Sequence, residues 1–148
     1  MPFVDTNVML YAACPGSHEQ IKAQIARQIL RRDDLALSVQ VLPEFYVQAT
    51  RPTRTQPLCH KEAIALIHSW LRFSVQENTV AVFQAALAAK ARFQISFWDA
   101  ASIEAARAVG CRQVLSEDLN PTQYYDGLVV VNPFASCPPP AHARQIPA

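Results

Sequence analysis

Apolar residues recur along the chain in two patterns, which predict alternating strands and helices. Short runs rich in apolar residues, typical of strands buried in a sheet, occur at residues 3–4, 35–38, 112–116 and 128–131, with a weaker one at 73–75. Between these runs, apolar residues return every three or four positions. This spacing predicts helices at about 17–32, 41–50 and 97–109, one marked by apolar residues between 63 and 71, and one that begins after Asn78 and Thr79.

Proline, serine and glycine define several ends of these helices. Pro43 is tolerated only in the first turn of a helix, so the helix at 41–50 begins close to Val41. Ser96 is placed to cap the helix at 97–109, and Gly110 is placed to end it.

Strands that alternate with helices predict a parallel sheet with helices on both faces. The expected fold class is therefore α/β, a three-layer α/β/α domain whose central sheet is mainly parallel. Folds of this class place their sites at the carboxyl ends of the strands, where the chain reverses direction. Residues that follow strands are accordingly the first candidates for function.

The composition fits one globular domain. The chain has 148 residues, of which 51% are hydrophobic, enough to bury a core. We expect the domain to span residues 1–134 and the proline-rich segment 135–148 to be a disordered tail. No apolar run approaches the roughly 20 residues of a membrane-spanning helix. The N-terminus shows no signal-peptide pattern, so we expect a cytoplasmic protein without a membrane partner.

Cysteine, histidine and net charge narrow the function classes. The four cysteines form no C-x-x-C pair and the four histidines no H-E-x-x-H motif, which argues against zinc and against a disulfide scaffold. The formal net charge of +1 does not by itself indicate a nucleic-acid partner. Arg51 and Arg54, which share the loop RPTRTQP, are the candidates for substrate contact.

Four acidic residues, Asp5, Glu44, Asp99 and Asp118, occupy equivalent places in the predicted secondary structure. Asp5 and Asp118 follow predicted strands, whereas Glu44 and Asp99 lie in the first turns of predicted helices. Carboxylates gathered at one edge of the sheet would repel one another strongly unless a divalent cation lay between them. The pattern therefore predicts a metal-dependent hydrolase, and a nuclease is the nearest chemical fit.

Each acid also has a structural explanation when it is considered alone. Asp5 could form a turn after a strand, Glu44 could be a favourable charge near a helix N-terminus, and Asp99 lies three residues after Ser96, as in a capping box. Four separate coincidences at one edge are nevertheless a weaker explanation than one metal site. Because two adjacent acids point in different directions, we assign Asp118 rather than its neighbour to the cluster.

Two polar residues are expected to support the acids. Asn7 lies at the same strand end as Asp5 and suits a site that holds water and metal. Ser116 precedes Asp118 by two positions and offers a hydroxyl group.

The segments that carry these residues resemble PIN-domain ribonucleases, specifically the VapC-type toxins of bacterial toxin–antitoxin pairs. The similarity runs from Phe3 to Phe134 and rests on FVDTNVMLYA, LPEFYVQATRP, ISFWDAASIEAA and VLSEDLNPTQYYDGLVVVNPF. By position, the resemblance assigns the four acids of the family to Asp5, Glu44, Asp99 and Asp118, and its supporting polar residues to Asn7 and Ser116.

The resemblance implies Mg²⁺ or Mn²⁺ as cofactor, RNA as substrate, a homodimer, and a cognate antitoxin that blocks the site. The chain departs from the family at its start, where Pro2 leaves the first strand shorter than usual, and in the proline-rich tail.

The predicted reaction is hydrolysis of RNA by a metal-activated water, which leaves 5′-phosphate and 3′-hydroxyl ends. Asp5 and Asp99 would bind the principal ion, and Glu44 and Asp118 would bind through water or a second ion. One alternative is a phosphatase of the haloacid-dehalogenase type, but that class needs a second acid where this chain has Asn7. The other is a PIN-like module that binds RNA or protein without cleavage, which the presence of all four acids disfavours.

Overall fold

The computed structural model describes residues 1–138 and contains a five-stranded sheet in the order β3-β2-β1-β4-β5. All four neighbouring pairs run parallel. The strands are β1 (Phe3–Val4), β2 (Ala36–Ser38), β3 (Ser74–Gln76), β4 (Gln113–Leu115) and β5 (Val129–Val131). The tail expected at 135–148 lies outside the described residues from position 139 onward.

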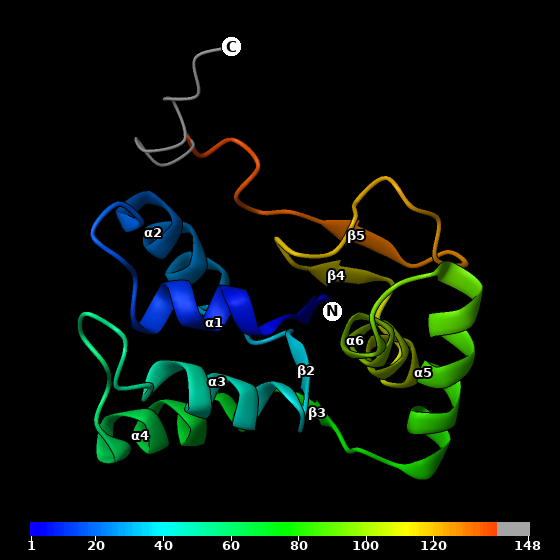
Figure 1. Ribbon diagram of the computed structural model, residues 1–148, viewed down its shortest axis with the longest axis horizontal. Coiled ribbons are helices and arrows are strands. Elements are labelled where there is room, and N and C mark those ends of the chain that lie inside the picture. Colours follow the sequence, from blue (N-terminus) through cyan, green and yellow to red (C-terminus); the bar gives the residue numbers. More distant parts are fainter. Residues whose placement is uncertain (139–148) are drawn as a thin grey trace.

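Helices cover both faces of this sheet and complete the expected three-layer α/β/α fold. They are α1 (Thr6–Ala13), α2 (Gln20–Ile29), α3 (Val41–Ala49), α4 (His60–Trp70), α5 (Val80–Phe93) and α6 (Phe97–Ala108). Figure 1 shows α1 to α4 on one side of the strands and α5 and α6 on the other. The predicted fold class is confirmed, and the sheet is fully rather than mainly parallel.

β1 is the shortest strand but occupies the centre of the sheet. Phe3 and Val4 are fully buried, as the middle of a parallel sheet requires. Although Pro2 has no N–H group, its carbonyl oxygen accepts a hydrogen bond from Ala36 N at 3.0 Å, so pairing with β2 begins before Phe3. Asp5 therefore leaves the sheet at the middle of its carboxyl edge.

α1 was not expected from the sequence. Its residues, TNVMLYAA, are apolar almost all round, so they show no stripe at helical spacing. The helix lies between its neighbours α2 and α3, and Val8 and Met9 are fully buried. The expected helix at 17–32 is also shorter than predicted, since α2 ends at Ile29.

The remaining expectations concern covalent chemistry and the membrane. Cys14, Cys59, Cys111 and Cys137 are all free, in agreement with the expected absence of a disulfide scaffold. None of the helices in residues 1–138 is long and apolar enough to cross a membrane.

Candidate active site

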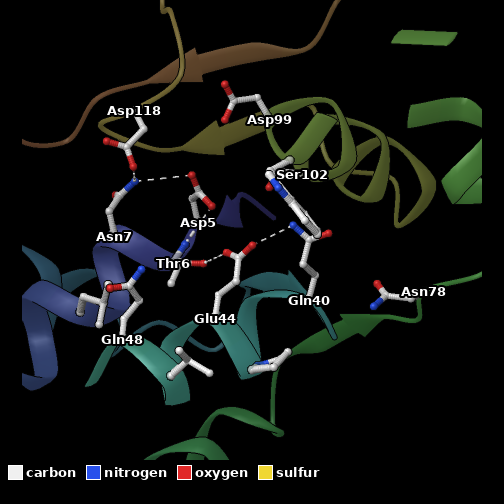
Figure 2. Close-up of a pocket in the computed structure, with 14 residues that line it drawn as sticks. Asp5, Thr6, Asn7, Gln40, Glu44, Gln48, Asn78, Asp99, Ser102 and Asp118 are labelled. Carbon is white, nitrogen blue, oxygen red and sulfur yellow. Dashed lines mark hydrogen bonds between the residues drawn. The ribbon is translucent and has the colours of Figure 1, made fainter. Parts of the chain in front are cut away.

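A cavity of about 750 Å³ opens at the carboxyl edge of the sheet. All four predicted acids line it, from four separate segments of the chain (Figure 2). Asp5 follows β1, Asp118 follows β4, Glu44 lies in the first turn of α3 and Asp99 in the first turn of α6. No lysine or arginine is among the described residues that line this cavity.

Asp5 is held by three donors. Its Oδ1 accepts a hydrogen bond from Thr6 N at 2.9 Å, which caps α1. Its Oδ2 accepts one from Ser116 Oγ at 2.7 Å and a long one from Asn7 Nδ2 at 3.5 Å. Burial raises the pKa of Asp5 to about 6, and the negative charges of Asp118 and Glu44 add to this effect. The turn-forming and cluster roles of Asp5 therefore coexist in one side chain.

Glu44 has both carboxylate oxygens occupied by uncharged donors. Thr6 Oγ1 donates to Oε2 at 2.7 Å, and Gln40 Nε2 donates to Oε1 at 3.0 Å. The Thr6 bond joins α3 to the start of α1, and the Gln40 bond lies within the first turn of α3. Together they fix the direction in which the carboxylate faces the cavity (Figure 2). Neither Thr6 nor Gln40 was identified from the sequence. The available signal was the position of Gln40 one helical turn before Glu44.

Asn7 connects the first and fourth acids. Its Nδ2 lies 3.2 Å from Asp118 Oδ2 and 3.2 Å from Ser116 Oγ. Its Oδ1 accepts a hydrogen bond from the backbone N–H of Glu117 at 3.3 Å. Asn7 and Ser116, both expected beside the acids, thus hold Asp5 and Asp118 in one network.

Asp99 faces the cavity, and its carboxylate interacts with the Ser96 hydroxyl at the start of the same helix, which lowers its pKa less than burial raises it. Ser96 Oγ accepts a bond from Asp99 N at 3.0 Å, so Ser96 caps α6 as predicted. The reciprocal bond of a capping box is not present within residues 1–138. Burial raises the pKa of the Asp99 carboxyl, and the charges of Asp118 and Glu44 raise it further.

The donor set suits a hard divalent cation. It consists of carboxylate oxygens, with one amide and one hydroxyl beside them, and Mg²⁺ and Mn²⁺ prefer oxygen ligands of this kind. Within residues 1–138, no three His, Cys, Asp or Glu side chains form a ready-made group that could hold a metal ion. The four acids are spaced around one cavity and do not form a compact group. Their oxygen atoms and their shared cavity are what suit them to a cation.

The two loop arginines lie outside the cavity lining. Arg54 donates from Nε to Gln48 O at 2.5 Å and from Nη1 to Cys14 O at 3.4 Å, so it holds the loop against α3 and the end of α1. Arg51 is exposed and makes no side-chain hydrogen bond or ion pair with the rest of the described chain.

Several lining residues were not predicted. Trp98 is 62% exposed at the cavity, whereas Trp70 is in the core. Ser102 lies one turn after Asp99 on α6 and is buried against the cavity. Gln48 and Asn78 complete the polar lining. Only the position of Trp98 directly before an acid in a first helical turn gave a sequence signal.

The fold has counterparts among known proteins. The family model of the PIN domain matches residues 3–126. The sarcin–ricin loop cleaving toxin VapC20 of Mycobacterium tuberculosis is similar in structure, with a TM-score of 0.63, 21% identity, and coverage of 80% of this chain and 92% of that one. A toxin–antitoxin complex from Klebsiella pneumoniae gives a TM-score of 0.65, 16% identity, and coverage of 90% and 98%. The FitAcB structure from Neisseria gonorrhoeae gives a TM-score of 0.56 and 18% identity, and the match covers 91% of this chain and 99% of that one. These likenesses show the fold, and no curated protein sequence matches the chain.

Proposed function

This chain belongs to the PIN domain family, and from that premise we propose that it is a metal-dependent endoribonuclease, the toxin of a toxin–antitoxin pair. One observation carries the proposal: Asp5, Glu44, Asp99 and Asp118 line a single cavity to which the described residues contribute no lysine or arginine. Four carboxylates in one cavity repel one another unless a cation lies between them. A cation beside an open cavity can activate water for phosphodiester hydrolysis. The similar VapC20 structure is that of a sarcin–ricin loop cleaving toxin, which supports RNA as the substrate.

In the proposed reaction, Asp5 and Asp99 would hold Mg²⁺ or Mn²⁺, while Glu44 and Asp118 would bind through water or a second ion. The bound ion would lower the pKa of a coordinated water and neutralise charge on the phosphate. Asn7 and Ser116 fix the positions of the Asp118 and Asp5 carboxylates by hydrogen bonds, and Thr6 and Gln40 orient Glu44 in the same way. Attack by water leaves a 5′-phosphate and a 3′-hydroxyl.

The proposed partners follow from the same reading. Arg51 is free to contact an RNA phosphate outside the cavity, while Arg54 shapes the loop that presents it. A cognate antitoxin is supported by the toxin–antitoxin complex among the similar structures. We also propose a homodimer, which the resemblance to the toxins of this family implies. A cytoplasmic location completes the proposal.

The two alternatives fit less well. A haloacid-dehalogenase-type phosphatase needs an acid at position 7, but Asn7 uses its amide to donate to Asp118 and Ser116. A non-catalytic PIN-like module has no need for two carboxylates whose pKa values are raised by burial and by their neighbours' charges.

The test is cleavage of a mixed cellular RNA pool by the purified protein, free of antitoxin. We expect cuts with Mg²⁺ or Mn²⁺, none with EDTA, and none by Asp99→Asn. Asp33→Asn is the matched control, because the Asp33 side chain is 97% exposed. Product 5′ ends should need phosphatase treatment before they can be labelled by a kinase. Cleavage that persists in Asp99→Asn would mean that the metal site is wrongly assigned.

A further inference from the structure

A second cavity, of about 230 Å³, adjoins the one that holds the acids. Gln40, Asn78 and Trp98 line both, so the two cavities adjoin along these side chains. Because Trp98 directly precedes Asp99 in the first turn of α6, the second cavity begins one residue away from a proposed metal ligand. A molecule whose phosphate lies among the acids would place its neighbouring group here.

The wall of the second cavity is aromatic. Trp98 is 62% exposed, and its ring meets that of Phe97 edge to face at 5.2 Å. Phe97 also packs edge to face against Phe83, which is 52% exposed, with 5.8 Å between the two ring centres. A large exposed aromatic surface beside a charged site is a platform for a flat ring.

Two polar side chains in the same cavity have unused hydrogen-bonding capacity. Ser38, at the end of β2, is 1% exposed and lines the cavity, yet its hydroxyl bonds to no other residue within positions 1–138. The Asn78 amide likewise bonds to no described residue and lies at the edge of the site (Figure 2). Both groups are therefore available to hydrogen-bond a molecule that enters the cavity.

We propose that the second cavity is a nucleobase subsite, in which an unpaired base next to the cleaved phosphate stacks on Trp98 and receives hydrogen bonds from Ser38 and Asn78. The proposal rests on the proposed function and adds to it the residues that receive the base beside the cleaved phosphate. In a duplex the faces of the bases are covered by stacking, so only an unpaired base can enter. A nucleobase offers a flat face to Trp98 and edge donors and acceptors to Ser38 and Asn78 at the same time, which favours the base over an aliphatic side chain.

The absence of basic side chains from the described lining of both cavities also supports a base as the occupant of the second one. No lysine or arginine is among the described residues that line either cavity, so phosphate contacts there depend on a bound cation. Contacts to a base would then supply both affinity and sequence preference, because phosphate contacts carry no sequence information.

Tryptophan fluorescence tests the subsite independently of cleavage. The chain has two tryptophans, and Trp70 is only 4% exposed, so a base that reaches a tryptophan reaches Trp98. The protein is mixed with labelled single-stranded RNA of mixed sequence in the presence of Mg²⁺. Binding is followed by the anisotropy of the label and stacking by quenching of tryptophan emission, both before products form. Fully paired RNA of the same composition and the Trp98→Phe protein are the references.

We expect single-stranded RNA to bind and to quench, paired RNA to give no quenching, and Trp98→Phe to lose most of the quenching signal. Binding without quenching would overturn the subsite while leaving the ribonuclease proposal to its own cleavage test. Absence of both binding and cleavage would overturn the proposed function and the subsite with it. Emission that responds to protein concentration or to a co-expressed partner, but not to RNA, would identify a protein interface and also overturn the subsite.

Variants then resolve the contribution of each residue. Trp98→Ala should raise the KM for single-stranded RNA about 10-fold, the size of one base–aromatic stack, and Trp98→Phe should retain most of the affinity. Tyr124→Ala is the matched control, since Tyr124 is 73% exposed and lines neither cavity. Ser38→Ala should change the pattern of cleavage sites more than the total rate. Trp98→Ala with an unchanged KM would exclude the stacking role.

Discussion

Lys22 Nζ lies 2.6 Å from Glu117 Oε1 and joins α2 to the loop that carries Asp118. The same ammonium group donates to the Tyr11 hydroxyl at 3.2 Å and lies 5.9 Å from the ring centre of Phe134. Glu117 Oε2 is buried without a hydrogen-bond partner in residues 1–138, so the charge of Glu117 depends on Lys22. The two adjacent acids thus separate, with Glu117 facing α2 and its neighbour facing the cavity.

We predict that Lys22→Met lowers the free energy of unfolding by roughly 2 kcal/mol, less than for a fully buried pair because both partners are partly exposed. It should also weaken Mg²⁺ binding, since the loop that bears Asp118 loses its anchor. Urea unfolding and metal titration by calorimetry measure the two effects. Adding Glu117→Gln to Lys22→Met should restore part of the lost stability. A single variant as stable as the wild type would show that the pair has no anchoring role.

The division between Glu117 and Asp118 shows what could be predicted from the sequence. Adjacent side chains in a loop diverge, so only one of the two could reach the cluster, and Asp118 is the one that lines the cavity. The placement of Asp5 and Asp118 after parallel strands followed equally from periodicity, because carboxyl ends of parallel strands share an edge. The pairing of β1 with β4, which makes the two acids neighbours, was not predicted.

Features that depend on long-range packing could not be predicted. α1 is apolar on most of its surface because it lies between other helices, which removes the stripe that marks a surface helix. The bond from Thr6 to Glu44 joins residues 38 positions apart, and no local pattern specifies such a contact. The exposure of Trp98 depends on where α6 meets the carboxyl edge of the sheet, and the local sequence does not specify that position.

Asp5 should destabilise the metal-free protein at neutral pH. Its folded pKa of about 6, against 3.8 for an ordinary aspartate, means that the folded state binds more protons between these values. The free energy of unfolding in EDTA should therefore fall as the pH rises from 4 to above 6, by at most about 3 kcal/mol. Asp5→Asn should remove most of this slope and be the more stable protein at pH 7.5. Thermal unfolding across this pH range provides the measurement. A wild type that gains stability with rising pH would contradict the argument.

Gln40→Ala and Thr6→Val each remove one of the two donors that orient Glu44. We expect each change to weaken Mg²⁺ binding about 10- to 100-fold, the range found when a partner of a metal ligand is lost, with only a small effect on stability. Gln48→Ala is the control, because Gln48 lines the same cavity but its side chain bonds to none of the acids. Equal metal affinity in Gln40→Ala and Gln48→Ala would mean that the orientation of Glu44 does not matter for the ion.

Ser116 is the most connected hydroxyl at the site, and its loss should affect both fold and metal binding. It is fully buried, donates to Asp5 Oδ2 at 2.7 Å, and accepts from Asp118 N at 3.2 Å and Leu119 N at 3.4 Å. Ser116→Ala leaves these donors unpaired, which costs about 1–3 kcal/mol of unfolding free energy. Ser102→Ala is the matched control, since Ser102 is also buried at the cavity but its hydroxyl bonds to no other described residue, so its loss should cost under about 0.5 kcal/mol. Denaturant unfolding of the two variants in EDTA compares them directly. If both lose the same stability, the network centred on Ser116 does not hold Asp5 and Asp118 together.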